Sequence, residues 1–188
     1  MSLNKRVESY FNVLADCMKN PFITDSEGVP ITPHAAYMRT LSELDAMHKT
    51  GGKVMFVGNG GSAAVASHMA IDYVRNGALR AMTFNDASAL TCMANDFGYE
   101  NVFAKQIAMH ARPGDVLMAI SSSGRSENIL KAVGAARERG CKVYTFSGFA
   151  EENPLRTFGD LNFYIASREY GVVEISHLAL IHSILDIR

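Results

Sequence analysis

Residues 53–62 read Lys-Val-Met-Phe-Val-Gly-Asn-Gly-Gly-Ser, which is an apolar run of strand length followed by a glycine-rich turn. Residues 62–75, which come next, are predicted to form a helix. The same order of strand, turn and helix returns at residues 115–139, where the turn reads Ser-Ser-Ser-Gly-Arg-Ser. Apolar strands that alternate with helices indicate a parallel sheet covered on both faces. The chain is therefore predicted to be an α/β protein.

The rest of the chain extends this pattern. Five strands are expected, at residues 53–57, 80–84, 115–120, 141–147 and 161–165. Helices are expected between and after them, at residues 62–75, 86–95, 102–110, 126–139 and 171–186. Two further helices, 3–19 and 32–50, precede the first strand, and a loop with three prolines at 20–33 separates them. We therefore predict one domain over 1–188, with N-terminal helices in 1–50 and an α/β core with a five-stranded parallel sheet in 51–188.

Composition limits the possible functions. The 188 residues suit one domain, and 48% apolar with 20% charged residues is ordinary for a globular chain. A net charge of -1 argues against nucleic acid or a membrane surface as partner. The three cysteines show no CxxC spacing, and no signal peptide or membrane span is evident, so a cytoplasmic location is expected.

Both turns are candidates for binding an anion. Each leads from a strand into a helix, where free N–H groups and the helix dipole favour a phosphate. The serine-rich turn adds four hydroxyl groups and needs no lysine. The candidate phosphate-binding residues are Asn59, Gly60, Gly61, Ser62, Ser121, Ser122, Ser123 and Ser126.

The two turns also allow other interpretations. No Gly-Lys-Ser/Thr follows either turn, which excludes a Walker A motif. Gly58, Gly60 and Ala63 fit a dinucleotide fingerprint, with Asp86 as ribose partner, but the serine-rich turn has no role in that scheme. Tight turns with a serine cap remain the purely structural alternative.

Three stretches carry a family resemblance: GNGGS at 58–62, SSSGRS at 121–126 and NDFGYENVF at 95–103. Together they resemble the sugar isomerase (SIS) domain, and within it most of all the phosphoheptose isomerases, over roughly residues 33–187. The resemblance implies a three-layer fold and a homotetramer that packs through the N-terminal helices and has active sites at subunit contacts. It also implies that phosphate is held by Ser62, Ser121, Ser123 and Ser126.

Acid, base and metal candidates lie on two helices. His68 and Asp72 are four residues apart and share one helix face, and the last helix carries Glu174 and His182. In similar phosphoheptose isomerases, a glutamate at the position of Asp72 acts in acid/base catalysis with a histidine at the position of His182. Members that hold zinc use all four positions, with glutamine at the position of Glu174. The sequence thus differs from the family twice, at 72 and at 174.

The geometry of the last helix raises a difficulty. Eight residues separate Glu174 from His182, which is about 12 Å along a straight helix. We therefore expect a distorted helix or ligands from neighbouring subunits, with His177 as an alternative partner. Three further residues are candidates for binding sugar hydroxyls, although Asp86 also suits a helix cap: Asp86, Asn95 and Asp96.

The resemblance leads to one functional hypothesis and two alternatives. The hypothesis is isomerisation of sedoheptulose 7-phosphate to D-glycero-D-manno-heptose 7-phosphate through an enediolate, with Asp72 and His182 moving the protons and zinc as a candidate cofactor. One alternative is a non-catalytic SIS module that binds a replication initiator protein. The other is an isomerase of a different sugar phosphate, because the turns recognise phosphate rather than the carbon chain.

Overall fold

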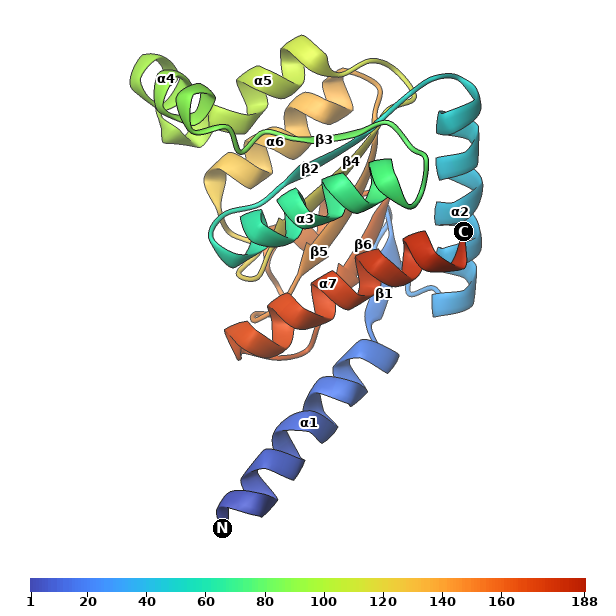
Figure 1. Ribbon diagram of the computed structural model, residues 1–188, viewed down its shortest axis with the longest axis vertical. Coiled ribbons are helices and arrows are strands. Elements are labelled where there is room, and N and C mark those ends of the chain that lie inside the picture. The colour runs from blue at the N-terminus through green and yellow to red at the C-terminus, as the bar shows by residue number, and fades with distance from the viewer.

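A six-stranded sheet forms the middle layer in the computed structural model, which describes residues 1–188 (Figure 1). Its strand order is β1-β6-β5-β4-β2-β3. All neighbouring strands are parallel except β1 and β6, which are antiparallel. The strands are β1 (Phe22–Asp25), β2 (Val54–Val57), β3 (Ala81–Thr83), β4 (Val116–Ser121), β5 (Lys142–Ser147) and β6 (Leu161–Tyr164).

Helices cover both faces of this sheet because the strand side chains alternate. Val54 and Phe56 of β2 belong to a core cluster with residues of α2, α3 and α7, whereas Met55 and Val57 belong to a second cluster with residues of α5 and α6. The helices are α1 (Leu3–Lys19), α2 (Pro33–Lys49), α3 (Gly61–Arg75), α4 (Ala87–Phe97), α5 (Val102–His110), α6 (Glu127–Glu138) and α7 (Tyr170–Ile187), with short 3-10 helices η1 (Tyr99–Asn101) and η2 (Pro154–Thr157).

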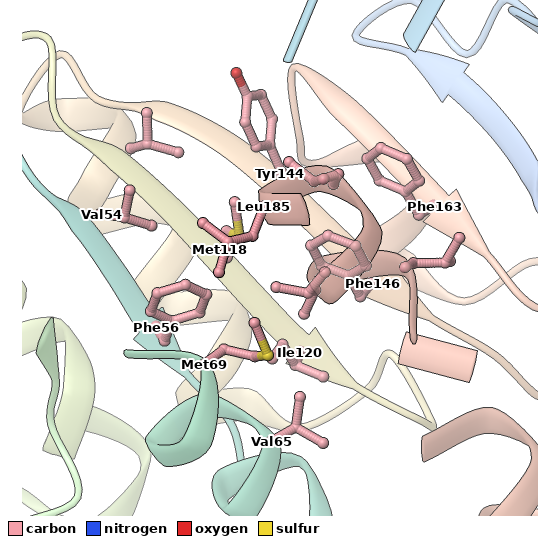
Figure 2. Close-up of a cluster of buried hydrophobic side chains, with 14 of the residues drawn as sticks. Val54, Phe56, Val65, Met69, Met118, Ile120, Tyr144, Phe146, Phe163 and Leu185 are labelled. Carbon is pink, nitrogen blue, oxygen red and sulfur yellow. The ribbon is translucent and has the colours of Figure 1, made fainter. Parts of the chain in front are cut away.

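Figure 2 shows the larger of these two clusters. Met69 of α3 and Leu185 of α7 lie over Phe56, Met118 and other strand side chains. Burying a side chain of this size stabilises the fold by about 1.5–3 kcal/mol. This packing fixes α3 and α7 on the same face of the sheet, which matters because both carry candidate site residues.

The prediction of an α/β fold with five parallel strands between helices is confirmed, but the sheet has a sixth strand that was not predicted, within the segment 20–33 that was expected to be a loop. Phe22–Asp25 forms β1, which pairs with β6 from Phe22↔Tyr164 to Asp25↔Leu161. Asp25 then ends the strand in a turn, since its Oδ1 accepts the N–H groups of Glu27 and Val29, both at 2.9 Å. The sheet therefore has a sixth, antiparallel strand at its edge.

Helix α7 is the one helix long and apolar enough to cross a membrane by length and composition. It lies on the sheet, with 44% of its residues buried. The buried positions include Val173, Leu180 and Ile184, all members of the larger core cluster. Its apolar character is thus explained by its place in the core.

Candidate active site

The two predicted turns lie side by side at one edge of the sheet. β2 and β4 are neighbouring parallel strands, paired from Val54↔Val116 to Val57↔Ala119, so the turns that follow them leave the sheet at the same end. Between the turns lies a cavity of about 250 Å³. Its lining comprises Asn59, Gly60, Gly61, Ser62, Ser121, Ser122, Ser123, Ser126, Tyr170 and Glu174. All eight residues proposed from the two turns therefore meet around one cavity.

The donors of this cavity are neutral. No lysine or arginine lines it. The hydroxyl oxygen of Ser122 is buried and has no hydrogen-bond partner within the protein. A buried polar group without a partner is costly, so a ligand that accepts a hydrogen bond from this hydroxyl would remove that cost.

Ser126 does not act as the serine cap that the purely structural alternative requires. It occupies the N-cap position of α6, but its side chain makes no capping hydrogen bond. Its hydroxyl lies 3.4 Å from that of Ser121 instead. Because the hydroxyl is not used to cap the helix, it remains free to face a ligand in the cavity.

Glu174 brings a carboxylate to the same cavity. A Cβ added at Gly61 would lie 2.3 Å from the Oε2 atom of Glu174, so the carboxylate packs directly on the backbone of the first turn. Only glycine permits this approach at residue 61. The family resemblance implied glutamine here, and the sequence instead places a negative charge beside the neutral donors.

Three of the four candidate metal ligands form a second group, between α3 and α7. The Nε2 atoms of His68 and His182 are 3.2 Å apart, and the Oδ2 atom of Asp72 lies 3.4 Å from the first and 3.7 Å from the second. Next to Asp72, the buried hydroxyl of Tyr73 donates to the carbonyl of Ile181 at 3.2 Å. This hydrogen bond joins α3 to α7 beside the cluster and so helps to hold the two helices at the spacing that the cluster requires.

The spacing of this group fits a divalent ion. In a tetrahedral zinc site with bonds of about 2.0–2.1 Å, neighbouring ligand atoms lie about 3.3 Å apart. The three separations in the cluster bracket this value, at 3.2, 3.4 and 3.7 Å. Two imidazoles and one carboxylate are also ligands that suit zinc.

Glu174 does not belong to this group, which comprises only His68, Asp72 and His182. Helix α7 is unbroken from Tyr170 to Ile187, so the distortion expected from the sequence does not occur. Eight residues along a continuous helix place Glu174 about 12 Å from His182 along the axis. Within one chain, the two residues therefore face different parts of the site.

His177 does not serve as the alternative partner, because it faces the core. Its side chain is fully buried, its Nε2 atom donates to the carbonyl of Ser147 at 3.1 Å, and its Nδ1 atom has no partner. Burial, which penalises the charged ring, lowers the pKa of His177 to about 4, although the hydrogen bond to Ser147 opposes this shift.

This low pKa predicts a loss of stability in mild acid. Between pH 6.5 and about 4 the unfolded chain binds a proton at His177 that the folded chain does not, so stability present above pH 6.5 falls as pH decreases. We expect a decrease of about 2 kcal/mol in the free energy of unfolding between pH 7 and pH 5 from this group. Urea unfolding at pH 7, 6 and 5 measures it. His177→Phe should remove this contribution and the exposed-site control His34→Gln should retain it; equal pH slopes for both variants would contradict the assignment.

The three candidates for binding sugar hydroxyls lie apart from the cavity, on or next to α4. Asp86 caps this helix, since its Oδ1 atom accepts the N–H of Ala89 at 2.9 Å. Asn95 and Asp96 are exposed and bonded to each other, with Nδ2 of Asn95 2.9 Å from Oδ1 of Asp96. None of the three lines the cavity between the turns.

Three further residues at the site were not found from the sequence. Tyr170 lines the cavity as the first residue of α7. Asn128 and Tyr99 bind the side chain of Asn59. No local pattern distinguishes these residues, because their role depends on contacts between distant segments.

A parallel sheet with two hydroxyl- and amide-lined turns around one cavity defines an α/β protein with a polar cavity at the carboxyl ends of its strands. Comparison with known proteins identifies the family to which this fold and site belong. The SIS domain matches residues 35–148. A phosphoheptose isomerase from Rhodospirillum rubrum is 37% identical over 187 residues, which cover 96% of this chain and 94% of that protein. One from Yersinia pestis is 34% identical over 189 residues, covering 96% and 93%.

Solved structures extend the likeness to three dimensions. The phosphoheptose isomerase GmhA from Neisseria gonorrhoeae superposes with a TM-score of 0.82 at 29% identity, and the comparison covers 99% of both chains. The chain therefore belongs to the SIS domain family, and within it to the phosphoheptose isomerases.

Proposed function

We propose that this chain is an aldose–ketose isomerase that converts sedoheptulose 7-phosphate to D-glycero-D-manno-heptose 7-phosphate. The observation that carries the proposal is the cavity between the two turns, where neutral donors surround a buried, unpartnered hydroxyl of Ser122. In this role the cavity holds the phosphate, with Ser62, Ser121, Ser123 and Ser126 as further donors. The curated relatives are themselves phosphoheptose isomerases.

The length of the substrate is compatible with both parts of the site. Eight bonds separate C1 of an extended heptose 7-phosphate from phosphorus, which corresponds to about 10 Å. Along α3, Ser62 precedes His68 by about 9 Å and Asp72 by about 15 Å. A substrate anchored by its phosphate at the turns thus extends toward the cluster at its other end.

Asp72 and His182 are the proposed proton carriers. Asp72 takes the proton from C1 and returns it to C2, which passes the sugar through an enediolate. His182 moves a proton from the oxygen on C1 to the oxygen on C2, so that the aldehyde forms as the ketone is reduced to a hydroxyl group. The carboxylate and the imidazole are 3.7 Å apart, close enough to act on adjacent atoms of one substrate.

A divalent ion, with zinc as the first choice, is proposed at His68, Asp72 and His182. When bound, it would polarise the carbonyl group and stabilise negative charge on the enediolate oxygens. Glu174 would complete the ligand set only from a neighbouring subunit. Metal analysis of the purified protein and of His68→Ala tests this assignment independently of activity.

A cytoplasmic homotetramer with active sites at subunit contacts is proposed as the working form. Helix α1 extends away from the body of the molecule (Figure 1), and its exposed apolar residues include Leu3 at 71% and Phe11 at 61%. Such side chains on one helix are typical of a surface that is covered in an assembly.

The assembly makes a specific prediction. Light scattering should give a mass four times that of the 20.5 kDa chain, and Phe11→Glu should lower it because a charge would have to be buried in the contact. Met109→Glu, at an equally exposed apolar residue of α5, is the matched control and should leave the mass unchanged. A monomeric wild-type chain would contradict the proposal.

The activity itself is tested with the purified chain and sedoheptulose 7-phosphate, following the aldose product by NMR with and without added zinc. Fructose 6-phosphate, a six-carbon ketose phosphate, is the matched substrate control. Conversion of the heptulose alone supports the proposal, and preferred conversion of the hexulose indicates a different sugar phosphate. No turnover of either substrate under both conditions would overturn it.

A further inference from the structure

Two amide side chains, that of the half-buried Asn59 and that of the buried Asn128, join the two turns to each other. Nδ2 of Asn59 donates to Oδ1 of Asn128 at 2.8 Å, and Nδ2 of Asn128 donates to Oδ1 of Asn59 at 2.9 Å. The two bonds close a reciprocal pair, which fixes both the separation and the relative orientation of the side chains. The hydroxyl of Tyr99 adds a third bond, to Oδ1 of Asn59, at 3.2 Å.

Asn59 is the only residue from Gly58 to Gly61 that has a side chain. The turn runs from Gly58 to Gly61, and its three other residues are glycines, which have no side chain to hold them. Glycine also loses the most conformational freedom on folding, so a turn made of it is costly to keep in one shape. Apart from backbone contacts, a hydrogen bond to the side chain of Asn59 is therefore the way in which the second turn can hold this turn in place.

Asn128 is placed to provide that bond from the second turn. It lies in the first turn of α6, two residues after Ser126, and only 3% of it is exposed. It does not line the cavity. The pair with Asn59 thus spans from the helix that follows one phosphate-binding turn to the centre of the other.

We infer that Asn128 is a positioning residue that sets the gap between the two turns, so that their donors converge on one phosphoryl group. Asn128 has this role only if the cavity binds phosphate, as proposed above. Donors that are held in place before the ligand arrives bind it more tightly, because their ordering does not have to occur on binding. Tyr99 supports the same arrangement from η1.

Binding of inorganic phosphate measured by calorimetry is the direct test, because it needs no turnover. Asn128→Ala should weaken binding by about tenfold, the effect of losing hydrogen bonds worth about one decade in an equilibrium constant. Asn128→Asp should weaken it further, since the carboxylate cannot donate to Asn59 and adds a negative charge near the phosphate. The double variant Asn59→Ala/Asn128→Ala should bind no worse than the weaker single variant, because the two residues act as a unit.

A matched control separates positioning from general stability. Asn162 is equally buried, at 1%, and its side chain binds Thr145 and the backbone of Asp25 and Gly159, none of which lines the cavity. Asn162→Ala should therefore lower the melting temperature without changing phosphate affinity in the folded protein. Wild-type affinity in Asn128→Ala, or additive losses in the double variant, would overturn the inference.

The outcome is distinguishable from failure of the proposed function. If the wild-type chain binds phosphate but does not isomerise the heptulose, the proposed reaction fails while the role of Asn128 is still decided by the affinities. If the wild-type chain binds no phosphate, both are overturned. With an active enzyme, Asn128→Ala should raise KM by about the same factor and change kcat less, since the side chain does not reach the reacting carbons.

Discussion

Asp72→Asn is expected to lower kcat for the isomerisation by about 10²–10⁴-fold, the usual contribution of a positioned acid or base. The amide keeps the size of the side chain but cannot accept the proton from carbon. Phosphate affinity should be unchanged, because Asp72 lies on α3 outside the cavity between the turns. Conversion rates at saturating sedoheptulose 7-phosphate measure the effect.

Two further variants serve as controls for Asp72→Asn. Asp186→Asn changes an exposed carboxylate one helical turn after His182 and should leave kcat as it is. Asp72→Glu restores the residue that the family resemblance implies at this position and should keep substantial activity. If Asp72→Asn retains more than about a tenth of wild-type kcat, a loss smaller than acid/base catalysis supplies, Asp72 is not the base.

Gly58→Ala is expected to lower kcat/KM by about a hundredfold. A Cβ at residue 58 would lie 2.5 Å from the carbonyl carbon and oxygen of Ser62 and 2.9 Å from the nitrogen of Ala63. These are backbone atoms, so relief requires the start of α3 to move, and a displacement of about 1 Å in a positioned site can cost this much in rate. Overpacking of this kind should also cost about 1–3 kcal/mol in the free energy of unfolding.

The matched control for this substitution is Gly134→Ala. Gly134 lies within α6, and a Cβ there meets nothing within 4 Å. Alanine should therefore stabilise the protein by about 0.5–1 kcal/mol, through its better helix propensity, with no change in kinetics. Urea unfolding and initial rates distinguish the two variants, and wild-type kinetics for Gly58→Ala would show that the turn is not as rigid as its packing indicates.

Much of the fold was predictable because its signals are local. Each of the strands β2, β4 and β5 corresponds to one continuous apolar run in the sequence. The helices between them likewise each correspond to one continuous segment. β1 was not predictable in this way, since Phe22–Asp25 is short and lies among prolines and turn residues. Its strand conformation comes from pairing with β6, and the residues near β1 in the sequence give no sign of this contact.

The features of the site were likewise predictable only where their signals are local in the sequence. The two turns were identifiable because each is a contiguous motif, and their meeting followed from the adjacency of parallel strands. Helix geometry also indicated that Glu174 lies too far from His182 to share one ion within a chain, and in the structure Glu174 lies outside the group of His68, Asp72 and His182. The amide pair of Asn59 and Asn128 joins positions 69 residues apart, so it emerges only when the chain is folded.

The antiparallel strand β1 has a consequence for how the chain matures on the ribosome. β1 leaves the exit tunnel long before its only strand partner, β6, which is translated more than 130 residues later. At about 5–20 residues per second, the nascent N-terminal segment must wait on the order of ten seconds before its partner exists. Closure of this border of the sheet is thus a late event in biosynthesis, and until then the segment is exposed to chaperones and proteases.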